Sequence, residues 1–242
     1  LGLHAADLAG VAGSGAAGMT AAVTAHQLGA SVLVVEKEAA YGGTTSKSGG
    51  VVWIPANHKQ SSMGIDDSVE EGLAYLQGLI GDSVSEPRLR AYAERASEML
   101  GFMMRHSHVQ YTPLPKYMDY YEQVPGYKPG GRSMDPGAFN LRRLGAEAAT
   151  MRDDHFAILP FNVTVPEGKR LSAMNFGSYL LGIRLVLRYL LDIPARIKGK
   201  LDHRATLGPA LVASLRRSLM DRDIPLWLNS PMRELLLENG RV

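Results

Sequence analysis

The chain has 242 residues, of which 45% are hydrophobic and 21% charged, and its formal net charge is +2. This composition supplies enough apolar side chains for a packed core and excludes a disordered chain. The small net charge, with no lysine and arginine cluster interleaved with aromatic residues, gives no indication of a nucleic-acid partner. The absence of cysteine excludes disulfides, thiolate zinc sites and a thiol nucleophile.

The first predicted unit is a strand, a glycine-rich turn and a helix. The strand is expected within residues 7–12, although Gly10 is unusual in a central parallel strand. A helical pattern covers residues 19–28, and Gly29 ends it. The turn has the spacing of a dinucleotide-binding fingerprint, in which glycines let the backbone approach a pyrophosphate at the helix N-terminus. A plain packing turn is the alternative. The residues of the turn are Gly13, Ser14, Gly15, Ala16, Ala17 and Gly18.

An apolar strand is predicted next, over residues 31–35, and it leads directly into Glu36 and Lys37. Glu36 follows Gly18 at close to the roughly 20-residue offset from which a carboxylate accepts hydrogen bonds from ribose hydroxyls. The turn and this acid together predict a nucleotide site, with Lys37 beside the acid.

A second loop of small and hydroxyl-bearing residues follows the acidic strand end. A nicotinamide-binding fold would normally continue into a crossover helix at this point, whereas such a loop suits a longer cofactor lying extended along it. The loop therefore favours FAD. Its candidate binding residues are Gly43, Thr44, Thr45, Ser48, Gly49 and Gly50.

These motifs resemble a known family. The fingerprint, the Val35-Glu36-Lys37 strand end, Gly42-Gly43-Thr44-Thr45 and the segment 48–55 are similar to the FAD-binding domain shared by fumarate reductase flavoproteins and 3-ketosteroid dehydrogenases. Trp53-Ile54-Pro55 is similar to the 3-ketosteroid 1-dehydrogenase branch. The resemblance implies an α/β fold, a Rossmann-like FAD-binding domain with a parallel sheet, helices and a helical and loop-rich insertion.

The same resemblance implies how the chain is organised. Residues 1–56 are expected to form the βαβ core and flavin loop, 57–200 an insertion near the substrate, and 201–242 the return to the FAD core. Asn239-Gly240 indicates a hairpin at the end of the chain. We therefore expect residues 1–242 to be an FAD-binding domain truncated at its C-terminus, with the catalytic domain following residue 242.

Within the insertion, residues 68–106 have a helical pattern, and 111–166 are rich in proline, glycine and tyrosine. Residues 117–122 and 130–136 extend the resemblance, which implies that Tyr120 is an active-site tyrosine. In that role it would assist removal of a ring proton while a hydride passes to flavin N5. The resemblance places a second tyrosine, as base, and the groups that polarise the ketone later in the chain. A tyrosine-rich loop that only packs is the alternative.

An amphipathic helix is predicted over residues 176–193, because Arg184, Arg188 and Asp192 form a polar stripe along it. This stripe excludes a membrane-spanning helix. A basic segment follows at 196–200, so weak contact of residues 176–200 with a membrane surface is one interpretation. Packing against the flavin domain is the other. Further on, Thr206 to Pro209 opens a helix, and residues 224–228 are predicted to return as a strand.

The leading functional hypothesis is an FAD-dependent oxidoreductase that dehydrogenates a 3-ketosteroid between C1 and C2, with a steroid-like ketone and an electron acceptor as partners. A fumarate-reductase-type enzyme for dicarboxylates is the first alternative, with Arg132, Arg142 and Arg143 as its candidate binding residues. A non-catalytic FAD-binding fragment is the second. No metal is expected from the scattered histidines. Without a visible signal peptide, we expect a cytoplasmic protein, with peripheral membrane contact as the exception.

Overall fold

The computed structural model describes residues 8–152, 161–197 and 202–235. Its central sheet is parallel, with strand order β1-β2-β8. Strand β1 pairs with β2 over its full length, from Leu8 opposite Ser31 to Ala12 opposite Val35. This continuous pairing forms a strand in spite of Gly10. The elements of this core are β1 (Leu8–Ala12), α1 (Ala16–Gln27), β2 (Ser31–Val35), α7 (Leu207–Met220) and β8 (Leu226–Trp227).

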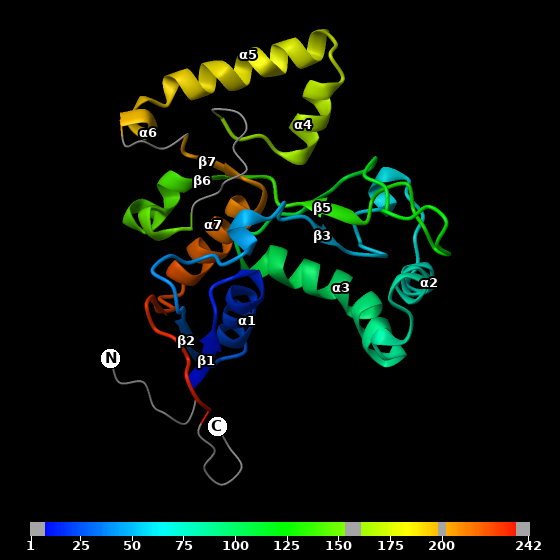
Figure 1. The fold of residues 1–242 in the computed structure, drawn as a ribbon, viewed down its shortest axis with the longest axis horizontal. Helices are drawn as coiled ribbons and strands as arrows, with labels where there is room; N and C mark the ends of the chain where they lie inside the picture. Colours follow the sequence, from blue (N-terminus) through cyan, green and yellow to red (C-terminus); the bar gives the residue numbers. More distant parts are fainter. Residues whose placement is uncertain (1–7, 153–160, 198–201, 236–242) are drawn as a thin grey trace.

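Helices α1 and α7 pack against each other, and α1 also contacts β1 and β2 (Figure 1). Helix α7 lies in the middle of the molecule, and most of its side chains are buried. This arrangement confirms the predicted α/β fold with a parallel sheet and helices. The core side chains come from both helices, from the sheet and from a helix that lies between β2 and α7 in the sequence; they include Met19, Val23, Val34, Leu100, Leu215 and Leu219.

Residues 52–135 contain two helices and a small antiparallel sheet of order β3-β5-β4. Ser68 caps the first helix by accepting a hydrogen bond from Glu71 N, and Pro87 lies in the first turn of the second. The predicted helical region 68–106 is therefore two helices separated by a short turn. The elements are α2 (Val69–Ile80), α3 (Glu86–His106), β3 (Val52–Trp53), β4 (Thr112–Pro113) and β5 (Ser133–Asp135), with 3₁₀ turns at Thr45–Lys47, Ser61–Met63, Gly81–Ser83 and Leu141–Thr150.

A separate layer of helices lies at one end of the molecule (Figure 1). Its helices α4 and α5 pack against each other, and both begin with a capping box, formed by Thr164 with Glu167 and by Asn175 with Ser178. An antiparallel pair, β6 with β7, lies beneath this layer. The bounds are β6 (Ala138–Asn140), α4 (Val165–Ser172), α5 (Phe176–Leu191), α6 (Ile193–Ile197) and β7 (Arg204–Thr206).

Several sequence predictions can be compared with these elements directly. The predicted helix at 176–193 is α5 with the start of α6, and the predicted strand at 224–228 contains β8. Within the described ranges, no helix is long and apolar enough to span a membrane. The hairpin predicted at Asn239-Gly240 and most of the basic segment 196–200 lie outside the described residues.

Candidate functional site

The glycine-rich turn connects the end of β1 to the start of α1. Gly13 has a φ of 95°, and its N–H donates to Val35 O over 2.8 Å, which ties the turn to β2. A Cβ on Gly18 would lie 1.9 Å from Gly13 O, so only glycine permits this close approach of helix and turn. The first amides of α1 lack intrahelical acceptors. The helix therefore directs N–H donors and its positive dipole end at the turn.

Glu36 stands at the end of β2 with a buried carboxylate. One of its oxygens accepts from Ser14 N, at 3.0 Å, and from Ser14 Oγ, and the other accepts from Glu38 N at 3.1 Å. Burial would raise the pKa of Glu36, but these hydrogen bonds outweigh it and hold the pKa below its usual value. Glu36 is therefore an ionised acceptor at neutral pH. The Lys37 side chain is exposed and pairs with Glu38 instead.

The second loop lies against the first. Thr45 Oγ1 accepts a hydrogen bond from Ala16 N at 3.0 Å. A Cβ added to Gly43 would lie 3.8 Å from Gly15 Cα, so the two loops are in van der Waals contact there. Ser14 Oγ accepts from Gly42 N at 3.0 Å, so Ser14 connects the loop to Glu36. The structure thus brings the predicted turn, acid and loop together at the carboxyl end of β1 and β2, where ligands bind in parallel α/β sheets.

Gly208, at the start of α7, is a residue of this region that sequence reasoning missed. Its N–H donates to Ser48 O at 3.0 Å, and a Cβ at this position would lie 1.9 Å from Thr45 O. Gly50, with a φ of 63°, would likewise bring a Cβ within 2.6 Å of Leu207 C. The second loop is therefore held against α7 by backbone contacts that require glycine on both sides. The Gly208-Pro209 pair was the available signal.

The residues that follow this loop in the sequence, Val51 and Trp53, help to line a cavity of about 440 Å³. Trp53 forms one wall and stacks with both Tyr75 and Tyr92, whose ring centroids are 5.8 and 6.4 Å away. Tyr120 also lines the cavity; 81% of this residue is exposed, and hydrogen bonding to it raises the pKa of Tyr117. The structure therefore places Tyr120 in the lining of an aromatic cavity. Val51, which directly follows Gly50 in the sequence, lines the same cavity.

A buried ionic cluster lies behind this cavity. The Arg132 guanidinium makes two hydrogen bonds to Asp67, at 2.6 and 2.8 Å, and one to Asp119 at 2.9 Å. Asp119 also accepts from Trp53 Nε1 at 2.7 Å. All three charged side chains are at most 1% exposed. Because Asp119 precedes Tyr120, this cluster fixes the cavity wall and the base of the Tyr120 segment together.

The same contacts bear on the dicarboxylate hypothesis. Arg132 is committed to two aspartates inside the protein and is not available to a substrate carboxylate. Arg142 pairs with Asp192 at 2.7 Å, and Arg143 lies over the Phe139 ring, 5.1 Å from its centroid. The three candidate arginines therefore do not converge on one site. No group of three potential metal-ligating side chains occurs among the residues that the structure describes.

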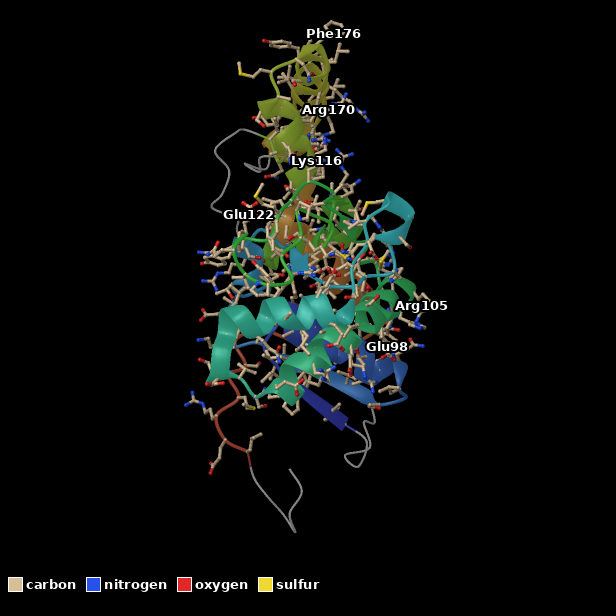
Figure 2. All side chains as sticks on the ribbon, turned by 90° about the vertical axis from the view of Figure 1, so that its right-hand side faces the viewer. Glu98, Arg105, Lys116, Glu122, Arg170 and Phe176 are labelled. Atoms are coloured by element: carbon tan, nitrogen blue, oxygen red, sulfur yellow. The ribbon has the colours of Figure 1, made fainter. Side chains whose placement is uncertain are left out.

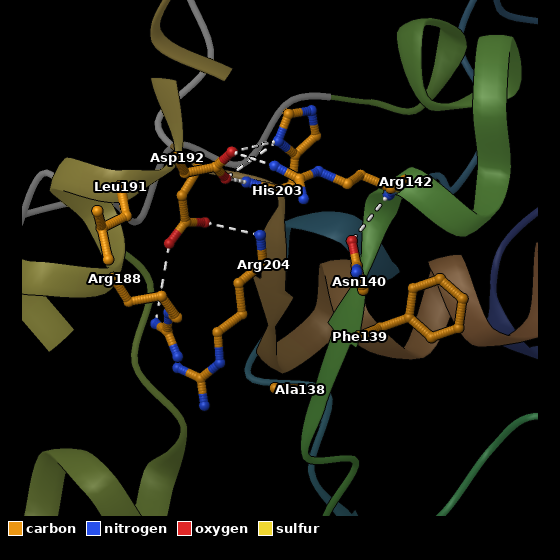
Figure 3. Close-up of a pocket in the computed structure, with 10 residues that line it drawn as sticks. Ala138, Phe139, Asn140, Arg142, Arg188, Leu191, Asp192, His203 and Arg204 are labelled. Carbon is orange, nitrogen blue, oxygen red and sulfur yellow. Dashed lines mark hydrogen bonds and ion pairs between the residues drawn. The ribbon is translucent and has the colours of Figure 1, made fainter. Parts of the chain in front are cut away.

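A second cavity, of about 430 Å³, lies between β6, β7 and the end of α5 (Figure 3). Asp192 joins Arg142 and His203 across it, at 2.7 and 2.8 Å. Arg204 makes two further ion-pair contacts to Glu167, at 2.7 and 2.8 Å. Of the residues named as candidates for cofactor or substrate binding, Arg142 lines this cavity, and there it is paired with Asp192. The cavity is a structural junction between the helical layer and the rest of the chain.

The comparison with protein families bears directly on the first site. The model of the family described as "FAD binding domain" matches residues 10–242. The chain belongs to this family. FAD is accordingly its cofactor, as the sequence predicted. The structure fits that cofactor: the backbone leaves room at Gly13, and Glu36 offers an ionised acceptor.

The curated relatives of this chain include enzymes from two bacteria. The 3-oxosteroid 1-dehydrogenase of Mycobacterium tuberculosis (strain ATCC 25618 / H37Rv) is 38% identical over 233 residues, which cover 96% of this chain and 41% of the relative. That of Comamonas testosteroni is 37% identical and is covered to the same extents. The chain thus spans about two fifths of these relatives.

Solved structures agree with this family. The 3-ketosteroid delta1-dehydrogenase from Sterolibacterium denitrificans, in complex with 1,4-androstadiene-3,17-dione, is similar with a TM-score of 0.89 and 43% identity; the match covers 96% of this chain and 42% of that one. A flavocytochrome c3 fumarate reductase shares the fold alone, with a TM-score of 0.52 and 16% identity. The resemblance stated from the sequence motifs is therefore confirmed.

The close contact at Gly18 leads to a prediction on FAD affinity. In Gly18→Ala the new Cβ would meet Gly13 O, so the turn must shift away from α1. Such overpacking costs about 1–3 kcal/mol, and we expect FAD to bind about 10- to 100-fold more weakly. Fluorescence titration of the apoprotein with FAD measures this. Gly10→Ala in β1 is the matched control, because its Cβ would meet no described heavy atom within 4 Å; equal losses in both variants would contradict the prediction.

Proposed function

We propose that the protein containing this chain is an FAD-dependent oxidoreductase that removes two hydrogens, one each from C1 and C2 of a 3-ketosteroid. The observation that carries the proposal is the position of the aromatic cavity. Tyr120 lines it, and so does Val51, the residue that directly follows the loop at 43–50. A flat ring system suits stacked Trp53, Tyr75 and Tyr92. The similarity to 3-oxosteroid 1-dehydrogenases over 233 residues supports the same substrate class.

The described residues divide the work in this proposal. Residues 13–18 hold the pyrophosphate at the N-terminus of α1, Glu36 accepts from the ribose hydroxyls, and residues 43–50 lie along the flavin side. When bound, FAD would supply the acceptor, its N5, for one of the two hydrogens as a hydride. The other leaves as a proton, and Tyr120 assists its removal from the ring carbon. A second substrate, an electron acceptor, must then reoxidise the cofactor.

The two alternatives make different demands on the structure. A dicarboxylate enzyme needs free cationic side chains that converge on the substrate, and the three candidate arginines of this chain are held by other contacts. A non-catalytic FAD-binding fragment needs only the cofactor region. The aromatic cavity has no role in such a fragment, which is why we favour the dehydrogenase.

Anaerobic spectroscopy of the full-length, FAD-loaded protein tests the proposal. We expect the visible flavin band to bleach when 4-androstene-3,17-dione is added, because the steroid then reduces the cofactor. The matched control is 1,4-androstadiene-3,17-dione, which already has the C1–C2 double bond and must leave the band unchanged. A band that persists with both steroids contradicts the dehydrogenase. Reoxidation of the chemically reduced protein by fumarate, without any effect of steroid, would favour the dicarboxylate alternative.

A further inference from the structure

Helix α5 presents one apolar side to solvent. Six large apolar or aromatic residues on this side are between 52% and 78% exposed. Their spacing of three or four residues places them on a single side of the helix. We call this surface the α5 apolar face; it consists of Phe176, Tyr179, Leu180, Ile183, Leu187 and Leu191. A helix stripe of this size is normally buried against another element.

The opposite side of α5 is fixed to the protein. Ser178 and Leu185 are buried, and Ser178 Oγ donates to Arg170 O in α4 at 2.6 Å. Asp192, directly after the helix, is held by Arg142 and His203 (Figure 3). These contacts fix the rotation of α5 about its own axis. The apolar face therefore points outward because of the fold, and the helix cannot turn it inward without breaking the ion pairs.

The charges around the face are positive. Arg184 is exposed along one edge of α5, and Lys169 and Arg170 are exposed on α4, whereas Arg188 points into the cavity beneath the helix and pairs with Asp202. The Arg170 guanidinium lies 3.3 Å from the position that a Cβ on Gly177 would take, so it sits beside the start of α5. Residues 165–191 contain one acidic side chain, Glu167, and Arg204 neutralises it. An apolar face with a cationic margin is complementary to anionic lipid headgroups over acyl chains.

The position of the helix permits contact with a flat surface. Helices α4 and α5 form one end of the molecule in both views, and Phe176 lies at its extremity, far from Glu98 and Arg105 of α3 (Figures 1 and 2). We propose that the α5 apolar face lies on an anionic membrane surface, parallel to the bilayer, with its aromatic residues at the headgroup level. This proposal does not rest on the dehydrogenase activity.

Vesicle sedimentation of the full-length, FAD-loaded protein tests the contact. We expect binding to vesicles of about three parts phosphatidylcholine to one part phosphatidylglycerol, with weaker binding to phosphatidylcholine alone and at high salt. The double substitution Ile183→Glu with Leu187→Glu should reduce the partition constant at least about tenfold, because each apolar side chain withdrawn from lipid contributes roughly that factor. The matched control is Leu28→Glu with Met99→Glu, which changes one exposed residue directly after α1 and one on α3.

The other possible occupants of the face are distinguished in the same experiment. The flavin spectrum and thermal melting of each variant establish that it folds, and Arg184→Glu alone tests the cationic margin by a milder change. Equal vesicle binding by the α5 variant and its control would overturn the proposal. So would absence of vesicle binding together with a change of oligomeric state in the α5 variant, which would assign the face to a second copy. Loss of thermal stability in that variant, again without vesicle binding, would assign it to another part of the same protein.

Discussion

Replacing Arg132 by methionine is expected to lower the free energy of unfolding by about 3–5 kcal/mol, because it leaves two carboxylates without their cation in the protein interior. Asp67 and Asp119 are both almost fully buried and both bind this guanidinium. Methionine keeps most of the side-chain volume, so the loss reports the charge and not a cavity. Urea unfolding followed by circular dichroism measures the difference.

Exposed Arg90 provides the control for this variant. It contacts Glu70, Glu86 and Glu94 at the surface of α2 and α3, so Arg90→Met should leave stability unchanged within error. Comparable losses of unfolding free energy in Arg90→Met and Arg132→Met would show that the effect does not depend on burial of the ionic cluster.

The stability difference should depend on pH in a specific direction. Burial would raise the pKa of Asp67, but hydrogen bonds from Arg132, Ala56 N and Gln60 hold it below its usual value. This contribution to the stability of the natural protein is therefore present above about pH 4 and is lost as the pH falls through the lowered pKa. Without Arg132, burial raises the pKa of Asp67, and the variant loses stability as the pH rises. The gap between the two proteins should accordingly narrow in acid.

The second large effect is expected at Tyr120. In the full-length protein, Tyr120→Phe should slow anaerobic reduction of the flavin by steroid by about 100- to 10,000-fold, the range for loss of a general acid or base. The ring remains, so the cavity keeps its shape. Because 81% of Tyr120 is exposed in this structure, the substitution should not change stability or FAD binding. Stopped-flow absorbance of the flavin band gives the rate.

Tyr121→Phe is the matched control for the hydroxyl. Tyr121 is half exposed, and its backbone N–H donates to the Tyr75 hydroxyl at 3.1 Å, a contact that the substitution leaves in place. We expect its reduction rate to stay within about twofold of the natural protein. A Tyr120→Phe rate equal to that of Tyr121→Phe would remove Tyr120 from the mechanism and leave the cavity as a binding site only.

The turn, the acid and the loop that we propose for FAD could be located from the sequence because their determinants are local. The 13–18 turn, the strand that leads into Glu36 and the loop at 43–50 lie within one continuous segment, and each has a residue pattern set by backbone geometry. The strand containing Gly10 was harder to recognise. Its stability comes from full-length pairing with β2, a contact that propensity alone does not report.

The contacts that form the wall of the aromatic cavity could not be predicted from the sequence, because they join distant segments. Arg132 pairs with Asp67 from 65 positions away, and Trp53 donates to Asp119 from 66 positions away. Sequence analysis singled out Arg132 for a substrate carboxylate, and only the fold shows that internal aspartates occupy it. Gly208 was missed for a related reason, since its requirement for glycine arises from the backbone of the distant loop at Thr45 and Ser48.

For this chain, the sequence by itself determined the fold class, the family and FAD as the cofactor, because periodic apolar patterns and closely spaced glycines act over a few turns of chain. The tertiary structure decided which charged groups are neutralised in the interior and which apolar side of α5 remains exposed. Both depend on contacts between segments far apart in sequence. A residue's type fixes what interactions it can make, and the packing of distant segments selects the interaction that it makes.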